Sequence, residues 1–242
     1  MQTTRVFSFV IILATIYLSA SCNGKTEEKN DLQSNSSLSK EDISDAKADV
    51  KLEKIKLPKN FTIEVWAANV PNARSLAISD EGIVFVGNRQ DKKVYALVDE
   101  NQDGKADTKY TLTDGLNMPN GVAYHDGDLY VAEVSRIIRF KDIQNTLNNP
   151  SYEVVYDQYP SENHHGWKFI AFGPDGMLYV PVGAPCNICD PEEEIFASIT
   201  RIDIKSPNPQ PEIYAHGVRN TVGFDWHPVT GEMGLRTMEE IC

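Results

Sequence analysis

A short unit of strand, tight turn and strand recurs along this sequence and restricts the folds that it can adopt. Each turn contains a glycine, which tolerates the positive φ that tight turns often require. The first three units are followed by a further apolar strand, so each repeat supplies several strands of a sheet. The copies recur at ~45–55 residues, a period typical of propeller blades. They occupy residues 73–86, 119–131, 163–180 and 219–231, and the additional strands end near residues 97, 140 and 203.

This period predicts an all-β fold: a six-bladed-type β-propeller that is incomplete, with about four blades between residues 54 and 242. A β-sandwich is the alternative, but sandwiches do not repeat one hairpin unit so regularly. The alternating residues 61–66 are expected to form one more strand before the first copy. An unfinished ring would leave strand edges unpaired and part of its core exposed.

Residues 1–21 are typical of a targeting segment. Arg5 provides a positive charge, an apolar run extends to Leu18, and small residues precede Cys22. The pattern resembles a bacterial lipoprotein signal with Cys22 as the lipidated residue, and a secretory signal with an incidental Cys22 is the alternative. The resemblance implies an outer-membrane lipoprotein of the bacterial cell envelope, held to the membrane by its lipid anchor and facing the periplasm or the cell surface.

Residues 22–53 are rich in charged and small polar side chains and poor in aromatic ones. Such a segment cannot bury enough apolar surface to fold alone, so it is predicted to be a disordered tether. The formal net charge of −12 leaves no basic face to meet phosphates, and nucleic acid is therefore not expected as a partner.

Three motifs in the second half of the chain occur in a defined order. They are His165 placed eight residues before Gly173-Pro174-Asp175-Gly176, then Val-Gly-Ala-Pro-Cys-Asn at 182–187, and then His-Gly-Val-Arg-Asn at 216–220. Together they resemble the soluble quinoprotein sugar dehydrogenases, the glucose/sorbosone dehydrogenase-like propellers that use pyrroloquinoline quinone (PQQ). The resemblance covers roughly residues 57–233.

The resemblance implies an oxidoreductase that oxidises a sugar or a sugar aldehyde and passes the electrons from PQQ to an external acceptor. His165 would be the general base, and His164 stands where the family can carry an Asp that orients it. Arg219 and Asn220 would contact the cofactor, and Asn120, in the equivalent loop of the second copy, is a further candidate for cofactor or substrate contact. The family also uses Ca²⁺ at the cofactor.

Simpler roles remain open for the same residues. The two histidines would otherwise be solvated loop residues, and Arg219 would form a surface salt bridge. Trp167 is either a platform on which a sugar stacks or part of the loop packing.

An acidic loop and a cysteine pair lie outside these motifs. Residues 99–107 resemble the first part of an EF-hand loop, although Tyr110 stands where that loop has its bidentate Glu; a solvated hairpin loop is the alternative. Cys186 and Cys189 are too few for a structural zinc site, and in an oxidising compartment a disulfide is favoured over redox catalysis. The candidate Ca²⁺ ligands are Asp99, Asn101, Asp103 and Asp107.

The last nine residues, 234–242, do not continue the β pattern. A one-nucleotide deletion in codons for Trp-Phe-Thr-Asp-Asn-Gly-Arg-Asp-Leu, the type of segment with which the family continues, yields Gly-Leu-Arg-Thr-Met-Glu-Glu-Ile-Cys. We therefore expect a frameshifted tail after Met233, which would remove part of the cofactor site. Two other functions stay open: a non-catalytic propeller lipoprotein that binds glycan or protein, and a lactonase-like hydrolase, whose metal cluster the loops do not supply.

Overall fold

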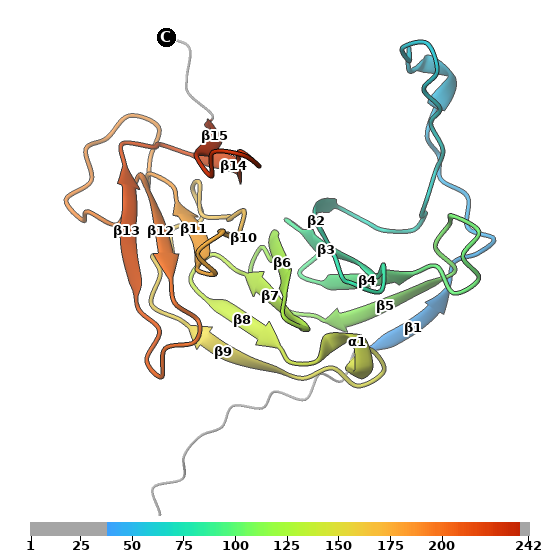
Figure 1. Cartoon of the computed structure of the whole chain (residues 1–242), viewed down its shortest axis with the longest axis horizontal. Helices are drawn as coiled ribbons and strands as arrows, with labels where there is room; N and C mark the ends of the chain where they lie inside the picture. The colour runs from blue at the N-terminus through green and yellow to red at the C-terminus, as the bar shows by residue number, and fades with distance from the viewer. Residues whose placement is uncertain (1–37, 238–242) are drawn as a thin grey trace, which may run out of the picture. The chain divides into compact units, whose positions relative to one another are not determined.

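The computed structural model describes residues 38–237 of the chain. The predicted signal segment, Cys22 and the first part of the predicted tether lie outside the described residues. The described chain forms four antiparallel sheets, and the hairpins of these sheets follow one another along the sequence (Figure 1). No helix of this part is long and apolar enough to cross a membrane.

The strands of each sheet are close together in the sequence. The first sheet has the order β1-β5-β4-β3-β2, the second β6-β7-β8-β9, the third β10-β11-β12-β13 and the fourth β14-β15. Their bounds are β1 Ser39–Asp42, β2 Ala73–Ile78, β3 Val84–Asn88, β4 Val94–Val98, β5 Thr108–Thr113, β6 Gly121–His125, β7 Asp128–Ala132, β8 Ile137–Phe140, β9 Tyr152–Tyr156, β10 Ala171–Phe172, β11 Leu178–Val182, β12 Ser198–Ile202, β13 Pro211–His216, β14 Thr221–Trp226 and β15 Met233–Thr237. A 3₁₀ turn, Leu52–Lys54, and a short helix α1, Ile143–Thr146, complete the elements.

The predicted repeat is confirmed. Each of the four copies is a hairpin, formed by β2 and β3, β6 and β7, β10 and β11, or β14 and β15, and each turn has a glycine with positive φ, where a side chain would be strained. The four glycines are Gly82, Gly127, Gly176 and Gly231. Successive antiparallel sheets built in this way confirm the predicted all-β fold of an incomplete β-propeller.

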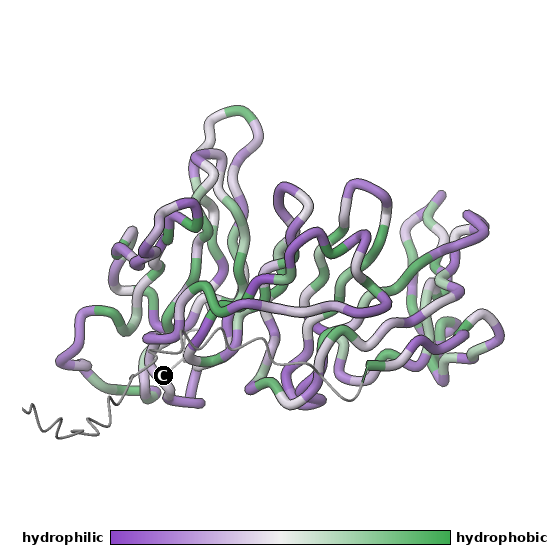
Figure 2. Tube along the Cα trace, turned by 90° about the horizontal axis from the view of Figure 1, so that it is seen from below, coloured by the Kyte–Doolittle hydropathy of each residue, from purple (hydrophilic) through white to green (hydrophobic). Residues whose placement is uncertain are grey.

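Apolar clusters join each sheet to the next, which explains why most central strands are buried on both faces. One cluster joins Phe85 of the first sheet to Val131 of the second, and another joins Tyr130 to Val180 of the third. A smaller cluster joins the third sheet to Phe224 of the fourth. Hydrophobic residues follow the strands, whereas most loops between them are hydrophilic (Figure 2). The loops are therefore free to carry the polar side chains of a site.

The structure corrects three expectations about the ends of the fold. Residues 39–42, which were assigned to the tether, form strand β1 along β5, and the adjacent Ile43 is buried. Residues 61–66 are not a strand; Phe61 is exposed, and Trp66 covers the apolar cluster that contains Ile43. Residues 233–237 pair with β14 as strand β15, because backbone hydrogen bonds can form where the side chains show no β pattern.

The last strand of each of the first three repeats was not identified from the sequence. These strands are β5, β9 and β13; β9 and β13 lie at a sheet edge, whereas β5 lies between β4 and β1. The first strand of the third repeat is short, since β10 contains only Ala171 and Phe172. Trp167 and Lys168 are buried in the preceding loop instead. This loop carries the histidine pair.

Candidate functional site

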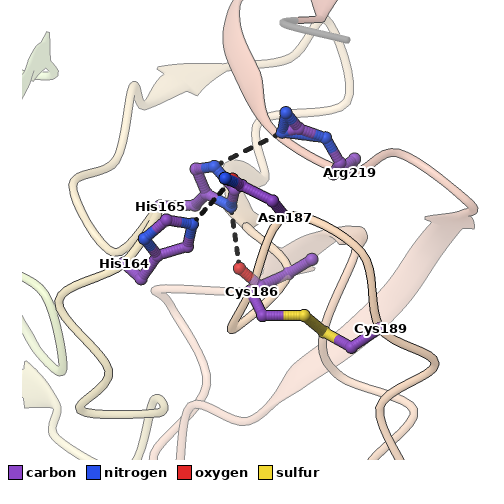
Figure 3. Close-up of a disulfide and its surroundings, with 7 residues drawn as sticks. His164, His165, Cys186, Asn187, Cys189 and Arg219 are labelled. Atoms are coloured by element: carbon purple, nitrogen blue, oxygen red, sulfur yellow. Dashed lines mark hydrogen bonds between the residues drawn. A yellow bond between two sulfur atoms is a disulfide. The ribbon is translucent and has the colours of Figure 1, made fainter. Parts of the chain in front are cut away.

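Three loops meet around His165. The first precedes β10 and carries both histidines, the second joins β11 to β12, and the third precedes β14 and carries Arg219 (Figure 3). All three lie at the same end of their sheets, because they leave or enter hairpin strands opposite the glycine turns. The predicted His165 and Arg219 are thus brought together from residues 54 positions apart.

Backbone and side-chain contacts orient the His165 ring. Its Nδ1 lies 2.9 Å from the carbonyl oxygen of Ala184. A carbonyl oxygen only accepts hydrogen bonds, so Nδ1 carries the hydrogen and, in the neutral ring, Nε2 keeps the lone pair. The guanidinium Nη1 of Arg219 donates toward Nε2 at 3.4 Å. A general base acting through Nε2 needs the ring hydrogen on Nδ1, and the backbone carbonyl of Ala184 favours this tautomer.

The position of Ala184 depends on a close approach between two loops. A Cβ atom at Gly183 would lie 2.5 Å from the Cβ of His165 and 2.6 Å from the His165 carbonyl oxygen. Only glycine fits at this distance. The Ala184 amide also donates to the carbonyl of Arg219 at 2.8 Å. Residues 183–184 therefore hold the base on one side and the arginine on the other.

His164 takes a different place from the orienting role suggested for it. Its ring is exposed and lies 4.0 Å from that of His165, centroid to centroid. Its Nε2 is 3.0 Å from the side-chain oxygen of Asn187 and donates to it (Figure 3). Asn187 lies between Cys186 and Cys189, which are joined by a disulfide. Ala184 and Asn187 were not identified as site residues from the sequence.

Lys168 is a buried amine beneath the histidine turn that sequence reasoning missed. It is 1% exposed, its Nζ donates to the carbonyl of Gly166 at 3.1 Å, and it lies 5.4 Å from the centre of the Tyr159 ring. Burial lowers the pKa of Lys168 from 10.5 to about 7, against a weaker opposing effect of the Glu162 charge. The hydrogen bond closes the turn that presents His165.

Asn120 connects this turn to the second sheet. It is 1% exposed and its amide nitrogen donates to the Lys168 carbonyl at 2.7 Å, while its Oδ1 is buried without a hydrogen-bond partner in residues 38–237. Asn220, also a predicted cofactor residue, is buried beside Arg219 in the loop before β14. Burying an amide oxygen without a hydrogen bond costs folding free energy. A hydrogen-bond donor placed at Asn120 Oδ1 would remove this cost.

Trp167 is packed rather than presented as an open platform. Its side chain is 8% exposed, and the guanidinium carbons of Arg74 and Arg89 lie 4.5 Å and 5.6 Å from its ring. A sugar cannot stack on a ring that is covered in this way. The two arginines, which come from the first sheet, were not identified from the sequence.

The acidic loop between β4 and β5 uses its oxygens internally. Asp107 accepts hydrogen bonds from the amides of Glu100 and Asn101, and Asp99 accepts from the amides of Asp103 and Gly104. Within the described residues no group of three or more His, Cys, Asp or Glu side chains could hold a metal ion. The oxygens of Asp99 and Asp107 thus brace the loop from within, and binding of Ca²⁺ by this loop stays a prediction.

A sequence family matches most of the chain that carries these loops. It is a domain of unknown function, DUF7133, which matches residues 47–228. The chain belongs to this family. An uncharacterized protein of Borreliella burgdorferi is 27% identical to the DUF7133 chain over 191 residues, which are 74% of this chain and 48% of the relative. The chain thus spans about half the length of the curated relative that it matches.

Solved structures similar to this DUF7133 chain include sugar-oxidising enzymes. The PQQ-bound aldose sugar dehydrogenase of Streptomyces coelicolor is 18% identical with a TM-score of 0.55, over 84% of this chain and 61% of that one. The putative oxidoreductase (glucose dehydrogenase) of Thermus thermophilus is 23% identical with a TM-score of 0.50, over 66% and 56%. The PQQ domain of pyranose dehydrogenase from Coprinopsis cinerea is 13% identical with a TM-score of 0.56, over 64% and 41%. At these identities the likeness establishes the fold.

Proposed function

We propose that the chain is part of a quinoprotein oxidoreductase that oxidises a sugar or sugar aldehyde with PQQ. The observation that carries the proposal is the arrangement of His165, with Nδ1 bonded to the Ala184 carbonyl and Nε2 facing the Arg219 guanidinium. This is a neutral base with a fixed tautomer beside a permanent cation. The fold shared with PQQ-bound enzymes supports the same reading.

The charges around His165 fit a carboxylate-bearing quinone. PQQ carries three carboxylates, and a guanidinium binds a carboxylate through two parallel hydrogen bonds. Arg219 is positioned to provide such a contact, and the unpaired Oδ1 of Asn120 can accept from a donor on a bound molecule. When bound, the quinone supplies the two-electron acceptor for a hydride from the substrate carbon. Calcium belongs to the same proposal, although residues 38–237 contain no group of three or more His, Cys, Asp or Glu side chains placed to hold it.

Within this chemistry the residues of the chain have separate tasks. Nε2 of His165 takes the proton of the substrate hydroxyl, which requires the lone pair that the Ala184 contact leaves there. Arg219 holds an anionic group next to that nitrogen, and Lys168 and Gly183 keep the turn in place.

The proposal is tested by reconstitution. The purified protein is mixed with PQQ, with and without Ca²⁺, and dye reduction is followed with aldoses and with a sugar aldehyde. Substrate-dependent dye reduction that needs PQQ is the expected result. Lactone hydrolysis without PQQ, or an unchanged melting temperature on adding PQQ, would instead favour a hydrolase or a binding protein. An external electron acceptor and the lipid anchor at Cys22 belong to the same proposal.

A further inference from the structure

Two arginines of the first sheet lie against the tryptophan that follows the histidine pair. Arg74 is in β2, and Arg89 directly follows β3. Ala73 and Asn88 are partners across these strands, so the two arginines leave the same end of the hairpin. Their guanidinium carbons lie 4.5 Å and 5.6 Å from the Trp167 ring. The indole thus gathers two permanent cations at one place.

The two arginines have no acidic side chain as an ion-pair partner within the described residues. Between residues 38 and 237 neither Arg74 nor Arg89 forms an ion pair, although the chain has 35 acidic and 23 basic residues. The acid nearest in sequence, Asp91, accepts a hydrogen bond from the Tyr95 hydroxyl instead. Both guanidinium groups are exposed, while Trp167 beneath them is buried. Two like charges on one ring repel each other, and an anion between them would relieve the repulsion.

The arginines are also tied to the histidine turn. The Asn88 amide, next to Arg89, donates to the Pro119 carbonyl at 3.0 Å, and Asn120 donates to the Lys168 carbonyl at 2.7 Å. A Cβ at Gly87 would lie 2.2 Å from the backbone carbonyl oxygen of Asn120, so the end of β3 packs closely against this loop. The hairpin end that carries both arginines therefore lies at the same end of the sheets as His165.

We infer that Arg74 and Arg89, held against Trp167, form a carboxylate-binding subsite beside His165 that accepts an acidic sugar such as a uronate. Guanidinium groups bind a carboxylate through paired hydrogen bonds, which a neutral sugar hydroxyl cannot match in strength. The subsite itself stands on the geometry of the first sheet; its use by a substrate depends on the proposed function. The carboxylate could come from the sugar or from PQQ, and the experiment separates the two.

The test measures ligand binding to the purified protein by calorimetry at low salt, first without PQQ. Glucuronate is the probe and glucose is the neutral reference. We expect glucuronate to bind more tightly than glucose, and the double change Arg74→Gln with Arg89→Gln to weaken glucuronate at least tenfold. Arg236→Gln, which removes an exposed arginine of β15, is the matched control and should leave the affinity unchanged. Circular dichroism checks that each variant is folded.

A second pair, Arg74→Lys with Arg89→Lys, keeps the charges but removes the paired donors, and it should weaken glucuronate as well. If glucuronate fails to bind but PQQ binds at least tenfold more weakly to both double variants, the subsite stands and its carboxylate is that of the cofactor. Equal affinities of wild type and both double variants for both ligands would overturn the inference. If the wild type binds glucuronate, both double variants lose that binding, and the wild type does not bind PQQ, the subsite is supported and the proposed function is refuted.

Discussion

Replacement of Lys168 by methionine should change how the stability of the protein depends on pH. Lys168 is 1% exposed, and burial lowers its pKa to about 7 from 10.5. The unfolded chain therefore binds one more proton than the folded chain between these two values. Folding stability consequently rises with pH in this window and is lost as the pH falls toward 7. Methionine has a similar length and carries no proton, so the variant lacks this dependence.

The size of the effect follows from the shift. One pKa unit corresponds to about 1.4 kcal/mol, so burying the amine costs roughly 4 kcal/mol at pH 7.5 and about 1.5 kcal/mol at pH 9.5. The wild type should gain about 2.5 kcal/mol of stability between these pH values through this group alone. The charge of Glu162 and the ring of Tyr159 face the amine. Burial raises the pKa of Tyr159, which keeps its own titration above the window.

The assay is denaturant unfolding of wild type and Lys168→Met at pH 7.5 and 9.5. The difference in unfolding free energy between the two proteins should move by about 2.5 kcal/mol in favour of the wild type at the higher pH. Lys105→Met, at an exposed loop position, is the control and should show no such change. If the difference between wild type and Lys168→Met is the same at both pH values, the amine is not buried as the structure has it.

Three further outcomes are expected. Gly183→Ala should destabilise the protein by about 1–3 kcal/mol in denaturant unfolding and lower dye reduction, because its Cβ meets His165; a stable, fully active variant would contradict the close approach. Cys186→Ser with Cys189→Ser should cost about 2 kcal/mol in the same unfolding assay, whereas reductant should then have no further effect. Expression in bacteria with radiolabelled palmitate should label the wild type but not Cys22→Ser; label in both would rule out this lipidation site.

The sequence allowed the repeat to be predicted because its signals are local. A glycine in each hairpin turn and the apolar strands beside it lie within a few residues of each other. Strand β1 could not be predicted from its polar residues 39–42, since its place depends on β5, which lies far along the chain. Strand β15 has its partner β14 close by in the sequence, but its side chains show no β pattern, and only the pairing with β14 defines it. An edge strand forms where a neighbouring strand offers unpaired backbone N–H and C=O groups, and the side-chain pattern of the sequence gives little sign of this.

Part of the site could be predicted as well. His165 and Arg219 were identified through the order of their motifs, and the structure brings them together. The carbonyl of Ala184 was missed, because no side-chain pattern marks a backbone acceptor. Lys168 was missed as well, because it lies in the loop before β10 and no local pattern marks its amine as buried. The contact of Trp167 with Arg74 joins two sheets and leaves no local signal either.

The central claim is that His165 is the base, and it is tested most directly by comparing two neighbouring substitutions. PQQ-dependent dye reduction is measured at saturating substrate and PQQ for wild type, His165→Ala and His164→Ala. We expect kcat to fall about 10²–10⁴-fold for His165→Ala. For His164→Ala, whose ring is exposed and bonded to Asn187, kcat should fall less than tenfold. Unchanged kcat in His165→Ala, or equal losses in the two variants, would contradict the account.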